Sequence, residues 1–423
     1  MPELVLRGGT VIDETGSRLA DVAVDAGVIV GVGDTLDGRT VLDASGCVVS
    51  AGFVDLHTHL RQPGREEAET IESGARAAAL GGYTAVVAMP NTEPAIDSAG
   101  VVREVLELGA KALCDVRPAG AITKGRAGGE LAPIAEMAAL GVRIFTDDGT
   151  GVQDSRLMRR ALEYSSALGV TLAQHCEDHG LAAGGHMHEG EWSSRLGIPG
   201  IPAEAEELMV GRDIALARLT GAPIHFLHMS TARSIELIRA AKAEGLPVTA
   251  EAAPHHFTLT HASVAGYDTV FKVNPPLRTD ADVAAVRAGL ADGTIDAIAT
   301  DHAPHSQEVK EAGFDEAPPG MLGLETAFAL ALRLGLPIER VLALLSWNPA
   351  RIAGLTAEHG GPIAEGRRAN LTVLDLDAQW TVVPEELASR SRNTPYAGWE
   401  LTGRARHTIL RGEPVVVDGE ATR

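Results

Sequence analysis

Cysteine is rare in this sequence. The 423 residues include only Cys47, Cys114 and Cys176, and no Cys-x-x-Cys pair occurs. A small, odd number of cysteines excludes a disulfide framework and is typical of a reducing compartment. Cys176 directly follows a histidine on an expected strand, so its side chain should point to the opposite face and fill the core rather than bind a metal.

Basic residues and long apolar runs are lacking too. The chain has 36 basic and 57 acidic side chains and a formal net charge of −21, which disfavours nucleic acid and anionic membranes as partners. No run of about 18 apolar residues predicts a membrane span, and the N-terminus shows no signal-peptide pattern. We therefore expect a cytoplasmic protein in which a local positive site captures any anionic substrate.

Aromatic side chains make up only 4% of the residues, so small and branched aliphatic side chains have to fill the core. From Gly52 onward, short apolar strands alternate with helical stretches rich in alanine and leucine. Eight strands alternating with helices predict an α/β protein with a (β/α)8 TIM-type barrel. The expected strands are 53–57, 84–89, 117–122, 142–146, 171–175, 224–228, 248–252 and 297–300.

The two ends of the chain differ from this middle part. Residues 1–50 and the residues from about 360 onward contain short strand-like runs separated by turns. We therefore expect a small β-sandwich-like domain formed by residues 1–51 and 360–423, next to a barrel of residues 52–359. The segment 306–323 is rich in proline and glycine and is either a mobile lid or a plain surface loop.

The clearest chemical signal is the stretch 53–64, where an apolar run ends in His57, His59 and Arg61. Alternate residues of a strand share a face, so the two imidazoles suit one zinc ion and the guanidinium suits a carboxylate. A lone His-x-His is often only structural. Further polar residues, however, follow or close other expected strands, where such a barrel has its active face: Asn91, Asp148, His175, His228 and Asp301.

Four imidazoles and two carboxylates are more ligands than one tetrahedral zinc needs. They suit two metals that share a bridging group, and a metal-bound water would be available as hydroxide near neutral pH. Taken singly, His175 or His228 is as well explained as a core histidine. The joint pattern favours a metal centre.

These motifs resemble the amidohydrolase superfamily, and within it the class I bacterial dihydroorotases. Asp-x-His-x-His marks only the superfamily, whereas Arg-Gln-Pro-Gly together with Met-Pro-Asn-Thr is much narrower. The segments that carry the resemblance are 55–64, 89–92, 145–149, His175, His228, 273–278, 300–305 and 323–326.

The resemblance implies the reversible, zinc-dependent cyclisation of N-carbamoyl-L-aspartate to L-dihydroorotate in de novo pyrimidine biosynthesis. In the hydrolytic direction, a metal-bound hydroxide would attack the ring amide while Asp301 acts as general acid and base. The resemblance implies that two zinc ions are held by His57, His59 and Asp301, by His175 and His228, and by a bridging Asp148. It assigns the substrate carboxylate to Arg61, Asn91 and His305, and the ring to Asn274.

One departure from the superfamily concerns the bridge between the metals. Many members use a carboxylated lysine at the end of strand 4, where this sequence has Asp147 and Asp148. Of the five lysines, Lys124 is the only alternative bridge, and it is otherwise expected to be a surface residue. A bridging aspartate leaves open whether both zinc sites are filled.

Two other functions stay open. Allantoinases, hydantoinases and dihydropyrimidinases share the metal pattern but do not need an arginine aimed at an exocyclic carboxylate. A noncatalytic relative that binds aspartate transcarbamoylase would lack metal ligands. The expected partners are a small-molecule substrate and a second copy of the chain in a homodimer, with an association with aspartate transcarbamoylase left open.

Several histidines lie outside the strand-end pattern. His255 and His256 follow an expected strand on the active face, so a role in the pocket is one interpretation of them. The other histidines off the pattern are expected to be surface groups: His179, His186, His188, His261, His359 and His407.

Overall fold

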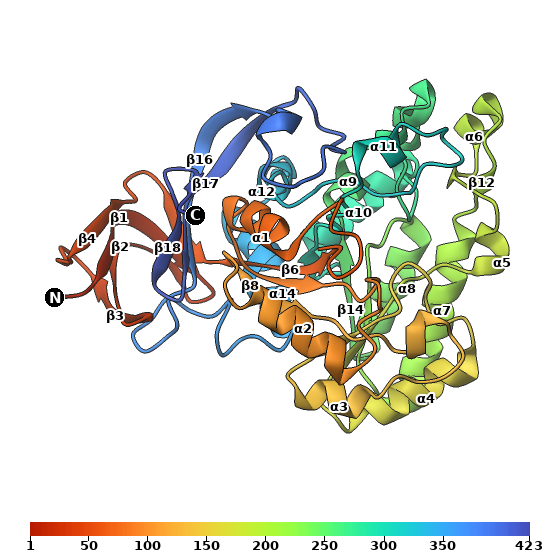
Figure 1. Cartoon of the computed structure of the whole chain (residues 1–423), viewed down its shortest axis with the longest axis horizontal. Coiled ribbons are helices and arrows are strands. Elements are labelled where there is room, and N and C mark those ends of the chain that lie inside the picture. Colours follow the sequence, from red (N-terminus) through yellow and green to blue (C-terminus); the bar gives the residue numbers. More distant parts are fainter.

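The computed structural model describes residues 1–423 and has two parts (Figure 1). At one end, strands from both chain termini form a nine-stranded sheet in the order β19-β18-β17-β16-β5-β1-β2-β3, with β4 paired to β1. This arrangement confirms the expected sheet from both ends of the chain. Its strands are β1 (Leu4–Asp13), β2 (Gly16–Asp25), β3 (Val28–Gly33), β4 (Thr40–Asp43), β5 (Val48–Ala51), β16 (Leu371–Thr381), β17 (Glu400–Leu410), β18 (Glu413–Val417) and β19 (Glu420–Ala421).

The remainder of the chain is α/β, as expected, and its main strands are parallel. One sheet has the order β6-β7-β8 and another the order β15-β14-β13-β10-β9. Isolated parallel bridges join Gly120 to Phe145 and Thr58 to His302, so the two sheets are linked at both edges. Their strands are β6 (Phe53–Thr58), β7 (Tyr83–Ala88), β8 (Asp115–Pro118), β9 (Ile144–Phe145), β10 (Thr171–Gln174), β13 (Ile224–Phe226), β14 (Val248–Ala252) and β15 (Ala297–Ile298).

Helices follow these strands along the chain. Several begin after a residue whose side-chain oxygen accepts a hydrogen bond from the first helical turn, such as Thr70, Asp154, Thr231 and Thr279. Such a cap stabilises a helix by about 1 kcal/mol. The longer helices are α1 (Ile71–Leu80), α2 (Ala99–Gly109), α3 (Ile134–Ala139), α4 (Ser155–Ser166), α7 (Glu204–Thr220), α8 (Ala232–Ala243), α10 (Asp280–Asp292) and α12 (Ala327–Leu332).

Shorter elements complete the chain. An excursion after β10 holds α5 (His179–Ala182), β11 (Met187–His188), α6 (Glu191–Leu196) and β12 (Gly200–Ile201), and its two short strands pair in parallel. The others are α9 (Pro254–Thr258), α11 (Gln307–Lys310), α13 (Ile338–Leu342), a π-helical turn (Ala343–Trp347), α14 (Asn348–Ile352), and single 3-10 turns at Lys124–Arg126, His261–Gly266, Thr269–Phe271 and Pro384–Glu386.

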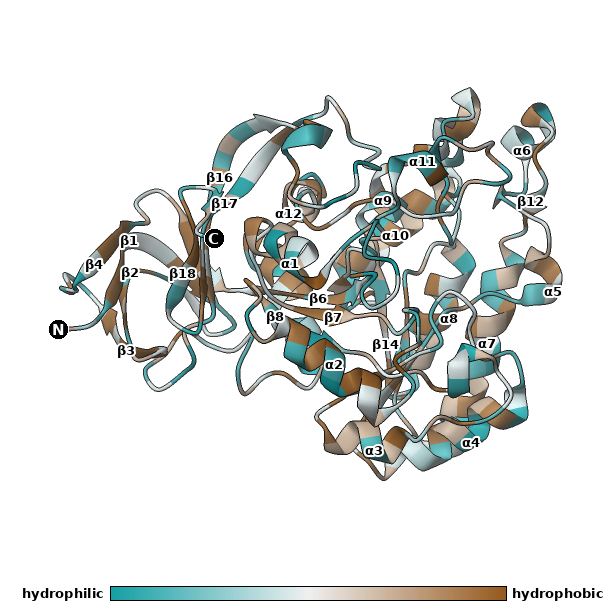
Figure 2. Cartoon of the chain, in the orientation of Figure 1, coloured by the Kyte–Doolittle hydropathy of each residue, from teal (hydrophilic) through white to brown (hydrophobic).

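Small aliphatic side chains fill the space between the parallel strands, as the scarcity of aromatic residues predicts. Leu56, Val87, Ile144, Ala173 and Ala297 come from five different strands and pack in a single buried cluster. A second, larger cluster of 71 buried residues lies mainly between the strands and the helices. Figure 2 shows the hydrophobic colouring along β6 and β7 and the mixed colouring of α2, which has one buried and one exposed face.

The C-terminal segment returns to the parallel strands between β16 and β17. The backbone N–H of Arg390 donates to Glu69, which stands just before α1, and the Tyr396 hydroxyl contacts Thr258. Asn393 accepts a hydrogen bond from the backbone N–H of His305. This segment therefore braces the loops that follow the parallel strands.

The prediction that the histidines off the strand-end pattern are surface groups is wrong for His188, His359 and His407, which are 8%, 1% and 1% exposed. Each ring has polar partners in the interior; His359, for example, contacts Thr84 and Asp115 at 3.0 Å. Burial and the nearby Arg278 lower the pKa of His188 to about 4, so this ring is neutral. Sequence alone does not reveal partners that are distant along the chain.

Two other expectations are confirmed. All three cysteines are buried and free, and Cys176 lies in the large hydrophobic cluster. None of the helices combines the length and the hydropathy needed to cross a bilayer.

Candidate metal centre and active-site cleft

Strand β6 carries His57, and the chain just beyond it carries His59. All six residues of β6 are buried. The Asp55 carboxylate on this strand accepts hydrogen bonds from the backbone N–H and the hydroxyl of Thr300, at 2.8 and 2.6 Å. Burial raises the pKa of Asp55 to about 6, although these hydrogen bonds oppose the shift. Asp55 thus fixes the end of β6 next to Asp301, which follows β15.

A first group of ligand atoms lies between β6 and the end of β15. Asp301 Oδ1 is 3.5 Å from His57 Nε2 and 3.2 Å from His59 Nε2. Asp148, which follows β9, lies 3.4 Å from His57 Nε2 through Oδ1 and 3.6 Å from His59 Nε2 through Oδ2. These four side chains are almost fully buried.

A second group shares the same aspartate. His175 Nδ1 and His228 Nε2 are 2.9 Å apart, and they lie 3.5 and 3.6 Å from Asp148 Oδ1. His175 follows β10 and His228 follows β13, so the chain supplies both from neighbouring strands. The structure therefore brings all six sequence-predicted ligands together, with Asp148 between the two groups.

The spacing of these atoms fits metal binding. Tetrahedral coordination with bonds of about 2.0–2.2 Å separates ligand atoms by about 3.3–3.6 Å, and most of the separations here are close to that range. His57 Nε2 and Asp148 Oδ1 are buried and have no hydrogen-bond partner in the protein. Buried polar atoms are rarely left in this state. The His and Asp side chains can accordingly hold a metal ion.

The electrostatics of the cluster favour a cation. Burial lowers the pKa of His57, but the Asp148 and Asp301 carboxylates outweigh it and hold the pKa well above its usual value. Burial raises the pKa of Asp301, and the surrounding imidazoles more than reverse this shift. Burial raises the pKa of Asp148 too, but the imidazoles hold it well below its usual value, so both carboxylates are ionised, and bound metal would replace the proton that they otherwise hold on His57.

The ring nitrogens that face away from the cluster have their own partners. His57 Nδ1 lies 2.9 Å from Glu251 Oε1, and His59 Nδ1 lies 2.8 Å from Asn91 Oδ1. The other oxygen of Glu251 contacts His225 Nε2 at 2.9 Å. A hydrogen bond at Nδ1 selects the tautomer in which Nε2 is free to bind a metal. Sequence reasoning missed Glu251, although a carboxylate within an otherwise apolar strand was a usable signal.

Backbone conformation at the site is unusual. Arg61, His228 and Asp301 have φ angles of 60°, 35° and 47°, in the left-handed region that non-glycine residues seldom adopt. Such conformations cost about 1–3 kcal/mol each and concentrate at functional sites. Three of the predicted site residues thus hold positions that local propensity alone disfavours.

A cleft of about 230 Å³ opens over the cluster. Arg61 lies at its side; its Nε donates to Pro304 O at 3.0 Å and its Nη2 lies 3.3 Å from His305 Nε2. The amide of Asn274 also faces the cleft, and its oxygen has no hydrogen-bond partner. The cleft is lined by His59, Arg61, Arg65, Asn91, Asp148, Gly149, His175, His228, Val273, Asn274, Asp301, Ala303, His305, Pro318, Pro319 and Gly320.

The segment 306–323 forms part of the cleft wall through Pro318, Pro319 and Gly320. Lys310 Nζ donates to Pro318 O and Gly320 O at 3.1 and 3.2 Å, so the segment is tied together from within. It is therefore more than a plain surface loop. Whether it moves as a lid stays a prediction.

Other candidates from the sequence lie outside the cleft. His255 Nε2 is 3.8 Å from Asp301 Oδ2, and His256 Nε2 donates to Pro275 O at 3.0 Å, but neither ring lines the cleft. Lys124 is exposed and pairs with Glu130 at 2.8 Å, so it is a surface residue and not a bridge between metals.

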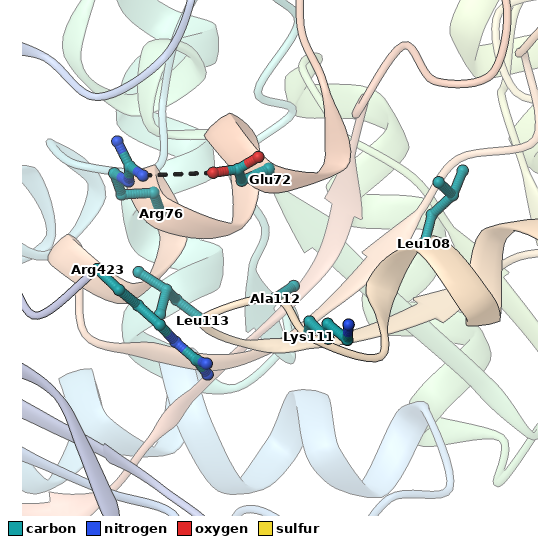
Figure 3. Close-up of a pocket in the computed structure, with 7 residues that line it drawn as sticks. All are labelled: Glu72, Arg76, Leu108, Lys111, Ala112, Leu113 and Arg423. Carbon is teal, nitrogen blue, oxygen red and sulfur yellow. Dashed lines mark hydrogen bonds and ion pairs between the residues drawn. The ribbon is translucent and has the colours of Figure 1, made fainter.

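A separate cavity of about 310 Å³ lies between α1 and the end of α2 (Figure 3). Glu72 and Arg76 form an ion pair there at 3.5 Å, and Leu108, Lys111 and Arg423 also line it. It is larger than the cleft but holds no histidine and only one carboxylate. The metal-competent chemistry belongs to the cleft.

Histidine and aspartate ligands at the ends of parallel strands, beside an arginine-lined cleft, define a metal-dependent hydrolase of the amidohydrolase type. Residues 46–234 match the family described as "Dihydro-orotase-like". The chain is 49% identical to the dihydroorotase of Pelotomaculum thermopropionicum, over 98% of this chain and 99% of that protein. It is 48% identical to the dihydroorotase of Streptomyces coelicolor, over the whole of both chains.

Solved structures with the same fold include the L-hydantoinase (dihydropyrimidinase) of Arthrobacter aurescens, with a TM-score of 0.90 at 24% identity, covering 100% of this chain and 98% of that one. The D-hydantoinase (dihydropyrimidinase) of Thermus sp. has a TM-score of 0.85 at 25% identity, covering 99% and 96%. At 24% identity, the similarity to the L-hydantoinase shows only that the two proteins share a fold. Because its identity to two dihydroorotases is 48–49% over almost the whole length of both chains, this chain belongs to the dihydroorotase family, within the amidohydrolase superfamily.

Proposed function

We propose that this chain is a zinc-dependent dihydroorotase, which interconverts N-carbamoyl-L-aspartate and L-dihydroorotate. The observation that carries the proposal is the identity of about 49% to dihydroorotases over almost the whole chain. The position of Arg61 beside the histidine and aspartate cluster supports it, because the product ring bears a carboxylate. The reaction belongs to pyrimidine biosynthesis.

The proposed cofactor is zinc, at two ions per chain. His57, His59 and Asp301 would hold one ion, His175 and His228 the other, and Asp148 would bridge them. The donor set of imidazoles and carboxylates fits zinc. Zinc at this position would supply an activated water and a Lewis acid for the amide carbonyl.

Asp301 is the proposed proton carrier. Its carboxylate lines the cleft, with Oδ1 toward His57 and His59 and Oδ2 toward His255. In hydrolysis, Asp301 would take the proton released by the attacking water and deliver it to the ring nitrogen as the amide C–N bond breaks. Ring closure is the reverse. Asp301 would remove the ureido N–H proton as the nitrogen forms the C–N bond to the carboxylate carbon. One oxygen of that carboxylate would then leave as water, carrying the proton from Asp301 and a second proton from solvent.

Substrate orientation falls to polar groups around the cleft. Arg61 Nε and one N–H of Nη2 contact Pro304 and His305, so both N–H groups of Nη1 and the second N–H of Nη2 are free to bind a carboxylate. Burial, Arg61 and Lys310 lower the pKa of His305, so its ring is neutral near pH 7. Asn91 and Asn274 would complete the contacts to the carboxylate and the ring.

The architecture that we propose is a (β/α)8 barrel of residues 52–359 with a small β domain of residues 1–51 and 360–423. The linked edges of the two parallel sheets support the barrel, as does the cluster of side chains from several of its strands. A homodimer and an association with aspartate transcarbamoylase are predictions from the family resemblance.

The test combines metal analysis with turnover. The purified protein should contain up to two zinc ions per chain and hydrolyse L-dihydroorotate at least about 100-fold faster than hydantoin or allantoin. Arg61→Met should lose dihydroorotate hydrolysis and keep its zinc. Preferred turnover of hydantoin or allantoin would instead assign a sister activity, and inactivity with two bound metals would favour a noncatalytic role.

A further inference from the structure

His255 is a buried histidine to which neither the metal centre nor the cleft gives a role. Its residue is 2% exposed, and its Nε2 has no hydrogen-bond partner in the protein. Buried polar atoms are seldom left in this state. The ring does not line the cleft, so its effect on a bound substrate would be indirect. The group that Nε2 faces therefore indicates what this histidine does.

His255 Nε2 faces Asp301 Oδ2, at a distance of 3.8 Å. This separation is about 0.8 Å longer than an ordinary N–H···O hydrogen bond, so a small rotation of either side chain would complete one. An ionised carboxylate can only accept hydrogen bonds, and each of its oxygens has two lone pairs. Oδ2 can therefore accept an N–H from His255 and still take a proton on its other lone pair.

The surroundings of His255 keep its ring neutral and in place. Burial lowers the pKa of His255 well below its usual value, and the neighbouring His256 lowers it further, so the ring carries a single N–H. The two rings pack with their centroids 4.3 Å apart and their planes at 61°. His256 Nε2 in turn donates to Pro275 O at 3.0 Å. The His255 ring thus packs against a neighbour that is itself fixed to the backbone.

The orientation of the Asp301 carboxylate needs a support at Oδ2. Oδ1 faces His57 Nε2 and His59 Nε2, at 3.5 and 3.2 Å, whereas Oδ2 faces His255. The last torsion angle of an aspartate side chain is broad, so contacts at Oδ1 alone fix the plane of the carboxylate poorly. A reacting group that is misplaced by about 1 Å can lose about 100-fold in rate.

We propose that His255 is a positioning residue for the proton carrier: its Nε2–H holds Asp301 Oδ2 in the orientation from which the carboxylate moves a proton between the attacking water and the ring nitrogen. The proposal rests on the proposed dihydroorotase function and on the role of Asp301 in it. His255 keeps its own proton throughout, so the proton balance stays as written for Asp301. The segment 251–256 would then support two metal ligands, since Glu251 contacts His57 Nδ1 at 2.9 Å.

His255→Leu removes the N–H and tests this role. It should lower kcat about 10–100-fold in both directions, because a misaimed carboxylate slows the proton transfer and a variant cannot change the equilibrium constant. The KM values should stay within about twofold of the wild type, because the ring does not contact the substrate. The zinc content should be unchanged. His255→Gln should keep kcat within about fivefold of the wild type, because the glutamine amide N–H₂ can donate to the same oxygen.

His407→Leu is the matched control for the loss of a buried imidazole. His407 is 1% exposed, and its ring contacts Asp43 O and the Asp418 N–H in the sheet formed by both chain termini. Its replacement should lower thermal stability and leave kcat unchanged. A double variant tests the route: in an Asp301→Asn enzyme, His255→Leu should lower the residual kcat by less than about twofold, because the group that it positions no longer carries a proton.

Turnover and zinc content together decide the matter. Wild-type kcat in a zinc-loaded His255→Leu enzyme would overturn the inference, as would an equal loss in His255→Gln or a full further loss in the Asp301→Asn enzyme. If His255→Leu does not fold, His255→Phe takes its place, because it keeps a flat ring against His256 and has no N–H. Loss of the fold or of zinc in both variants would show that His255 supports the core or the metal centre instead, and would overturn the inference.

The wild-type assay separates this inference from the proposed function. A wild-type enzyme that hydrolyses no dihydroorotate would overturn the proposed function and the inference with it. Wild-type turnover that His255→Leu leaves unaffected would leave the function standing and overturn the inference alone.

Discussion

Replacing Glu251 by glutamine should weaken metal binding without changing any ligand. Glu251 is fully buried, and its two oxygens contact His57 Nδ1 and His225 Nε2, each at 2.9 Å. Burial raises the pKa of Glu251, but the hydrogen bonds from both histidines lower it well below its usual value, so the group is ionised. A glutamine has the same shape but no charge and only one acceptor oxygen.

The substitution leaves one imidazole N–H without its acceptor. If the amide N–H₂ faces His57, then His57 Nδ1 has to accept a hydrogen bond, and its proton moves to Nε2, which points at Asp148 and Asp301. That tautomer cannot bind a metal through Nε2. A lost hydrogen bond to a charged group costs about 1.5–3 kcal/mol, and the loss of such a support usually reduces metal affinity 10–100-fold.

Metal affinity should be measured on chelator-treated protein titrated with zinc against a competing chromophoric chelator. Glu206→Gln is the control, because Glu206 is also a buried carboxylate but contacts the backbone of Ser230 and Thr231 and no histidine. We expect a 10–100-fold loss of affinity for Glu251→Gln and less than a threefold loss for the control. Wild-type affinity in a folded Glu251→Gln protein would refute the account of the His57 tautomer.

Three further outcomes are expected. Asp301→Asn should lose most of kcat while it keeps substantial metal; near wild-type turnover of the metal-loaded variant would contradict its role as proton carrier. Burial raises the pKa of Glu325 to about 7, so between about pH 5 and 7 the folded chain keeps a proton that the unfolded chain releases, and rising pH lowers the stability of the fold. Glu325→Gln should reduce the fall of the thermal unfolding temperature across this pH range. An unchanged fall in the variant would argue against this role of Glu325. Lys310→Met removes the hydrogen bonds to Pro318 O and Gly320 O and should speed amide hydrogen exchange in segment 306–323; unchanged exchange would show that Lys310 does not hold this wall.

The sequence predicted the α/β class, the sheet from both termini and the main parallel strands. It did so because buried parallel strands form short apolar runs, and because helices of 3.6-residue periodicity lie between them. Boundaries were less accurate: the expected strand 117–122 is β8 at Asp115–Pro118, and β5 at Val48–Ala51 was not predicted. All four residues of β5 are buried between β1 and β16, so it has no alternating pattern.

The ligands could be predicted because each stands where a strand ends, and the carboxyl ends of parallel strands lie on the same side of a sheet. The tertiary structure alone decided what surrounds them. Glu251 supports His57 from 194 residues away, and Pro318–Gly320 close one side of the cleft. His359 and His407 were expected at the surface and are buried, because their partners come from remote parts of the chain. Local sequence specifies the chemistry of a side chain and the periodicity of its element, but burial and pairing depend on which distant segments pack together.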